Sequence, residues 1–257
     1  MPKPQPIVSQ LKALLPTLLW AYVPTLIMIG IVVWYALITG RRVWYFTNDP
    51  FILGNLPFYV GVLSSLANIL WGAAAAVCFF SALVLRAKDD GKRAENGKQR
   101  SEIGGRRTED GETKFPYSLR EEEGIGKMEE GSNNDNLYPL ARFLLASGLL
   151  TSLLLFDDLF QFHRIFYIKY FQVSAKMVFA GYGVLAMGYL LHFRKTIVAT
   201  EYLLLALALA FLGVAVVVDT TPLLPRGRTA FSDFLKFFGI VTWVAYFVRT
   251  GRVALRG

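Results

Sequence analysis

Two long apolar runs without any charged residue occupy most of the first third of the chain. Residues 13–40 and 50–85 are uncharged over 28 and 36 positions, respectively. A helix crosses the hydrocarbon core of a membrane with about 20 mainly apolar residues, whereas the apolar region of a cleavable signal has only about 7–15. We therefore predict that residues 18–39 and a segment within 57–85 form two membrane spans.

Four shorter uncharged runs follow in the second half of the chain, and they cover 14, 17, 17 and 12 residues, at positions 143–156, 177–193, 202–218 and 237–248. At about 1.5 Å per residue, the shortest run covers only about 18 Å of a hydrocarbon core roughly 30 Å thick. To cross, these helices must take charged residues into or near the membrane. The third span must include Arg142 or Asp157, and the sixth must extend back through Lys236 and Asp233.

The segment between the two halves, residues 87–137, holds 13 of the 19 acidic residues and eight of the glycines. With so few apolar positions it buries too little surface to offset the entropy of ordering, which predicts a disordered, charged linker. The predicted fold class is all-α, a polytopic transmembrane helix bundle of about six spans. Residues 1–86 supply two helices, and residues 138–257 supply four.

The net charge of +8 comes from Lys and Arg residues that flank the apolar runs. This placement fits lipid headgroups and predicts the bilayer as the immediate partner. The excess of Lys and Arg at one set of span ends places both termini and the linker in the cytoplasm, where the linker is available to membrane protein partners. No basic stripe interleaved with aromatic residues is present, so nucleic-acid binding is not expected.

Ionisable residues at membrane depth are costly and are functional candidates by default. The predicted topology gathers them near the non-cytoplasmic face; they are Asp157, Asp158, His163, Lys176, Asp219, Asp233 and Lys236. Asp219 follows an apolar helix, and because the helix dipole disfavours an anion there, a cation such as Lys236, Lys176 or a metal would stabilise it. The other interpretation is that these residues simply reach water at the interface.

Geometry limits two of the possible pairings. Asp157 and Asp158 are adjacent, so on a helix they point about 100° apart, and we expect only one of them to face the bundle. At the opposite end, His192 and Glu201 either pair across the Arg194–Lys195 turn or lie separately at the interface.

Two segments resemble a family of uncharacterised bacterial, especially cyanobacterial, multi-pass membrane proteins: FDDLFQFH (156–163) and FSDFLKFFGIVTW (231–243). The residues that match the family pattern are Asp157, Asp158, Phe160, His163, Asp233, Lys236, Gly239, Ile240 and Trp243. The family pattern has an acidic residue after the histidine, where this chain has Arg164, so a carboxylate–histidine role is not carried over. The resemblance implies a location in the bacterial cytoplasmic membrane and brings no assigned activity or cofactor.

Three functions fit the sequence. The first is a binding, transport or accessory protein that holds a small ligand, proton or ion in a polar pocket near its extracytoplasmic face, with Asp157 or Asp158 as acceptor. The second is a membrane-embedded metal-dependent hydrolase with ligands drawn from Asp158, His163, Asp219 and Asp233. The third is a structural or assembly subunit of a membrane complex.

Overall fold

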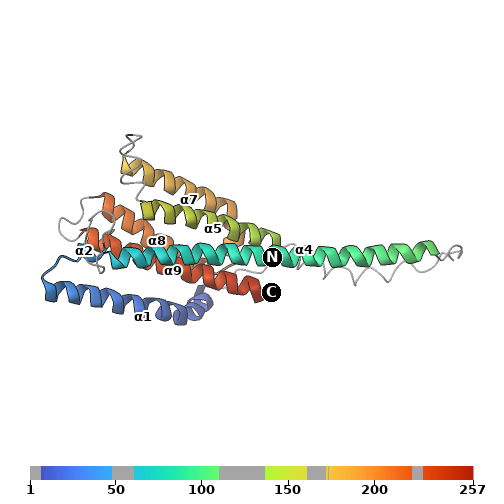
Figure 1. Cartoon of the computed structure of the whole chain (residues 1–257), viewed down its shortest axis with the longest axis horizontal. Helices are drawn as coiled ribbons and strands as arrows, with labels where there is room; N and C mark the ends of the chain where they lie inside the picture. The colour runs from blue at the N-terminus through green and yellow to red at the C-terminus, as the bar shows by residue number, and fades with distance from the viewer. Residues whose placement is uncertain are drawn as a thin grey trace.

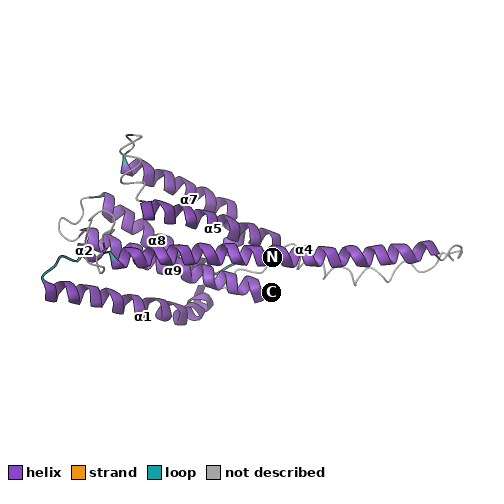
Figure 2. Ribbon diagram, in the orientation of Figure 1, coloured by secondary structure: helices purple, strands orange, loops and turns teal. Residues whose placement is uncertain are grey.

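The computed structural model describes residues 7–47, 61–109, 137–160, 172, 174–221 and 228–256, and this part of the chain is helical without strands (Figure 2). The helices are α1 (Ile7–Thr39), α2 (Trp44–Thr47), α4 (Val62–Glu109), α5 (Leu137–Phe160), α7 (Ala175–Val198), α8 (Tyr202–Thr220) and α9 (Arg228–Arg256). All of them except α2 contain a stretch long and apolar enough to cross a membrane. The prediction of an all-α, multi-pass protein with six candidate spans is therefore confirmed.

Successive long helices run in opposite directions, so the bundle has two ends (Figure 1). At the first, here called the Lys236 end, α1, α5 and α8 finish, and α4, α7 and α9 begin. At the second, the Arg249 end, α1, α5 and α8 begin, and α7 and α9 finish. Helix α4 passes through the Arg249 end and continues beyond the other helices (Figure 1).

Helix α9 lies at the centre of the packing and contacts α4, α8, α1 and α5. Its side chains Ile240, Trp243, Tyr246 and Phe247 are almost completely buried, together with Phe143 of α5. By contrast, α1 and α7 lie at the periphery, and they expose large apolar side chains such as Trp20 and Val184. Apolar exposure on this scale is typical of a surface that faces lipid.

Hydrogen bonds between helices accompany this packing. Three of them join uncharged side chains: Trp243 Nε1 donates to Thr151 Oγ1 at 3.1 Å, Ser147 bonds the Tyr189 hydroxyl at 2.6 Å, and Tyr22 bonds Thr242 at 2.7 Å. Such bonds are common between membrane helices, where the alternative is a polar group in hydrocarbon. They fix the register of α5 against α9 and α7, and of α1 against α9.

The predicted disordered linker, residues 87–137, differs from the structure over its first part. Helix α4 continues to Glu109, so residues 87–109 are helical, and residues 110–136 lie outside the described part of the chain. Charged residues on this extension are spaced for contacts one helical turn apart, and Arg93 Nε lies 3.1 Å from Asp89 Oδ2. A helix that is already formed in the membrane also extends without a new nucleation step.

Candidate functional site

Within the described residues, an ion pair joins α9 to a neighbouring element at each end of the bundle. At the Lys236 end, the Lys236 ammonium donates to a carboxylate oxygen of Asp158 on α5. At the Arg249 end, the Arg249 guanidinium donates through two nitrogens to the Glu201 carboxylate, which precedes α8. Ionisable groups within spans that face the bundle and pair with one another are candidates for function.

The last two turns of α5 bring two carboxylates into the protein. Asp157 is 7% exposed, and the Asp158 side chain is 15% exposed. The expectation that only one of the two would face the bundle is therefore not met. The physical reason is that α5 contacts α4, α7 and α9, so that two directions about 100° apart both meet neighbouring helices.

Helix α4 contributes two uncharged polar side chains near this level. Gly72 of α4 lies beside Leu155 of α5, and Phe79 of α4 lies beside Gly148 of α5. The two helices are therefore antiparallel, and extending the same register by one turn places Asn68 at the level of residues 158 and 159. Buried atoms Asn68 Oδ1 and Trp71 Nε1 have no hydrogen-bond partner among the described residues. We use the name polar layer for Asn68, Trp71, Asp157, Asp158 and Lys236.

Trp71 also connects the polar layer to the core. It is 3% exposed, and its ring meets that of Trp243 edge-on with centroids 5.9 Å apart. Trp243 in turn donates to Thr151. The layer thus rests on tightly packed aromatic side chains at its inner side, which restricts the movement of the groups that line it.

The remaining predicted site residues either lie at the same end of the bundle as the polar layer or fall outside the part of the chain that the structure describes. Asp219 and Asp233 are half-buried at the same end, on α8 and α9, where Ser232 Oγ donates to the Ala215 carbonyl at 3.0 Å. Lys176 is exposed at the start of α7. His163 lies outside the described residues. Across the residues that are described, no three His, Cys, Asp or Glu side chains gather closely enough to hold a metal ion.

The ion pair at the Arg249 end was not foreseen from the sequence. Glu201 was considered with His192, but His192 is exposed and packs edge-on against Phe193, with ring centroids 4.6 Å apart. Arg249 additionally donates to Thr17 Oγ1 of α1 at 2.5 Å. One signal was available, because Glu201 is the only acidic residue outside the linker that the predicted topology places at that end.

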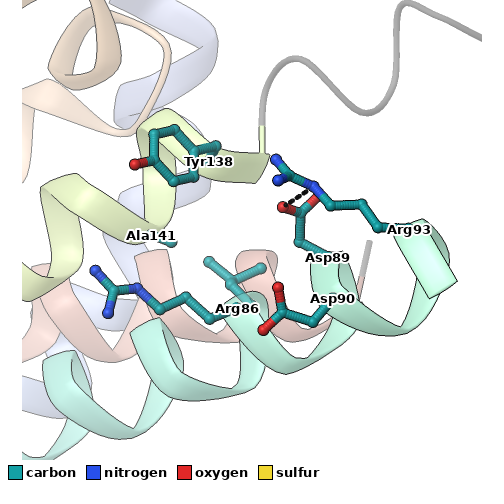
Figure 3. Close-up of a pocket in the computed structure, with 7 residues that line it drawn as sticks. Arg86, Asp89, Asp90, Arg93, Tyr138 and Ala141 are labelled. Atoms are coloured by element: carbon teal, nitrogen blue, oxygen red, sulfur yellow. Dashed lines mark ion pairs between the residues drawn. The ribbon is translucent and has the colours of Figure 1, made fainter.

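A cavity of about 230 Å³ lies between the extension of α4 and the start of α5 (Figure 3). Arg86, Asp89, Asp90 and Arg93 line it together with Tyr138, and Arg93 pairs with Asp89. Two positive and two negative side chains leave this cavity without a preference for an anion or a cation. It is also far from the polar layer, since the two lie at opposite ends of the bundle.

Comparison with known families gives one match. Residues 133–250 match the model of a domain of unknown function, DUF8692. The match runs from just before α5 to the next-to-last turns of α9, and it contains every predicted site residue as well as Glu201 and Arg249. It agrees with the predicted resemblance to a family without an assigned activity. No curated protein and no solved structure matches the chain.

Proposed function

We propose that this chain is a non-catalytic membrane protein that binds a proton or a small cation at Asp157, within the polar layer. The observation that carries the proposal is the burial of Asp157 in a span, at the position next to Asp158, which pairs with Lys236. A carboxylate that is buried in a span is costly in its charged form, because it has lost contact with bulk water. That cost favours the uptake of one positive charge.

The uncharged members of the polar layer support the same chemistry. The Asn68 carbonyl oxygen is the kind of ligand that small hard cations prefer, alongside carboxylate oxygens and water. Buried polar atoms are normally hydrogen-bonded, and ordered water commonly supplies the partner that the protein does not. Asn68 Oδ1 and Trp71 Nε1 therefore support a layer that holds water or a hydrated cation beside the carboxylates.

The test compares Asp157→Asn with wild type in the full chain, purified into nanodiscs. Melting temperature is recorded with Na⁺, K⁺, Mg²⁺ or Ca²⁺ against choline at equal ionic strength, and the infrared band of a protonated carboxyl group is recorded in parallel. We expect either a cation-dependent rise in melting temperature or a protonated carboxyl band, and its loss in Asp157→Asn. The matched control, Asp90→Asn, removes an exposed carboxylate at the other end of the bundle and should leave both signals unchanged.

Two outcomes would overturn the proposal. The first is a wild-type protein that shows neither signal, or an Asp157→Asn variant that responds like wild type. The second is stoichiometric tightly bound metal in elemental analysis that survives Asp157→Asn and disappears in His163→Ala. This result would favour the metal-dependent enzyme instead.

A further inference from the structure

A second cavity opens on a different side of the molecule, between α4 and α9 at the Arg249 end. It is a groove of about 400 Å³, which lies within the usual range of small-molecule sites. Val77, Phe80, Val248 and Leu255 give it apolar walls, and Arg252 and Arg256 lie at its mouth. The groove shares no residue with the polar layer, so it is independent of the function proposed above.

The order of side chains along α9 changes from apolar to basic toward the end of the span. Val248, Arg252 and Arg256 are each four residues apart, so they lie one above the other on one face of the helix. At about 1.5 Å per residue, the three cover about 12 Å along the helix axis. The groove is therefore apolar at its deep end and positively charged near the end of the span.

The floor of the groove results from the close approach of α4 and α9. A Cβ atom added at Gly251 would lie 2.6 Å from Ser81 Oγ, so the two helices meet there through their smallest side chains. Larger side chains on either side, such as those of Phe80 and Val248, are exposed and form the two sides of the groove. The hollow is therefore a product of the helix packing itself.

The charge at the mouth is not neutralised by the protein. Neither Arg252 nor Arg256 forms an ion pair within the described ranges of the chain, and both side chains are exposed. Lys88 Nζ donates to the Leu255 carbonyl at 3.0 Å and adds a third positive charge nearby. The cavity in Figure 3 differs in this respect, because there Asp89 and Asp90 balance two arginines.

We propose that this groove binds an anionic phospholipid. One acyl chain lies along Val77, Phe80 and Val248, and the phosphate is held by Arg252 and Arg256. Guanidinium groups bind phosphate oxygens through two parallel hydrogen bonds, which is why arginine is favoured at such positions. Basic pockets between membrane helices, at the level of the headgroups, bind anionic lipids in the same way.

The test measures lipid adducts by native mass spectrometry of the full chain in detergent, titrated with phosphatidylglycerol or with zwitterionic phosphatidylcholine. Wild type should retain phosphatidylglycerol preferentially. The double variant Arg252→Gln/Arg256→Gln should weaken this binding by roughly five-fold for each arginine removed. Val248→Trp, which fills the apolar part while leaving both arginines, should weaken it as well.

The matched control is Arg194→Gln/Lys195→Gln, which removes two exposed charges from the last turns of α7 at the same end of the bundle. It should bind phosphatidylglycerol like wild type. An equal loss in the control pair would show general attraction to negative charge and would overturn the proposal. The proposal would also be overturned if wild type retained the two lipids equally. It would likewise be overturned if wild type formed a dimer without bound lipid and the groove variants changed only the oligomeric state.

Discussion

The two ion pairs of α9 described above lie at opposite ends of one helix, and they differ in the contacts that each cation makes and in the carboxylates nearby in the chain. At the Arg249 end, one guanidinium contacts both oxygens of one carboxylate and also a threonine hydroxyl of α1. At the Lys236 end, one ammonium contacts Asp158, and the next residue of the chain, Asp157, is a second buried carboxylate. The first cation therefore donates to three acceptor atoms, whereas the second donates to one, where two adjacent carboxylates are taken out of bulk water.

This difference fits a structural role at the Arg249 end and the binding role proposed for the Lys236 end. A bidentate pair that joins α8, α9 and α1 fixes three helices and leaves little capacity for a ligand. At the Lys236 end, two adjacent carboxylates are buried or nearly buried, and taking charged groups out of water is costly. Costly ionisable groups of this kind are typical of functional sites, in line with the proposed uptake of a proton or cation.

The largest expected effect comes from removing the arginine at the Arg249 end. Arg249→Met leaves the Glu201 carboxylate in a partly buried position without its partner, so the free energy of unfolding should fall by about 3 kcal/mol. Steric trapping in bicelles measures this change, and Arg194→Met, on the exposed end of α7, is the matched control. If the second substitution Glu201→Gln restores no stability, the two residues are not coupled and the structural role assigned to this end is wrong.

A smaller loss is expected from Gly239, one turn from Lys236. A Cβ atom at this position would lie 2.7 Å from Leu212 Cγ and 3.2 Å from the Leu212 backbone nitrogen. Gly239→Ala must therefore push α8 and α9 apart, and it should lower the free energy of unfolding by about 2 kcal/mol. Gly213→Ala, on α8 with open space around it, is the control and should raise stability by up to about 1 kcal/mol. Equal effects of the two would mean that the Lys236 end does not depend on close helix packing.

The smallest effect should come from the lysine at the Lys236 end. The Lys236 side chain is 38% exposed, so the pair itself contributes little, and protonation can neutralise the Asp158 carboxyl group that Lys236→Met leaves behind; the cost should therefore be only about 1 kcal/mol. The double variant with Asp158→Asn should recover most of this loss, because it also removes one of the two carboxylates. The melting temperatures of the two single variants and the double variant form the test. A cost as large as that of Arg249→Met would show that the two ends do not differ in the way described here.

The sequence predicted the helical spans and the gathering of charged residues at one end, but not how those residues pair. The length of each uncharged run indicates the length of a span. Because successive spans run in opposite directions, their order along the chain then decides which helix ends lie at the same end of the bundle. Pairing depends on which helices are neighbours in space. The contact of Arg249 with Glu201 requires α9 beside α8, and the burial of both Asp157 and Asp158 requires α5 to have neighbours on more than one side.

Two other features were missed for reasons of composition. Asn68 and Trp71 lie inside a long uncharged run. An amide or an indole side chain is less costly in a membrane span than a charged one, so its presence did not single out these positions as candidate site residues. The helical extension of α4 was predicted as disordered because the composition of the segment was averaged over its whole length. That average hides the contact between Arg93 and Asp89 one helical turn apart.

The extension of α4 sets the end of this helix well away from the rest of the bundle. Residues 94–109 add roughly 24 Å of helix beyond Arg93, the last residue of α4 that lines the cavity shared with α5 (Figure 1). Because the turns inside the bundle are already helical, the outer turns form without a new nucleation step. The same helix that packs against α5 and α9 thus acts as a spacer, which holds Glu109 apart from the membrane-spanning part of the protein.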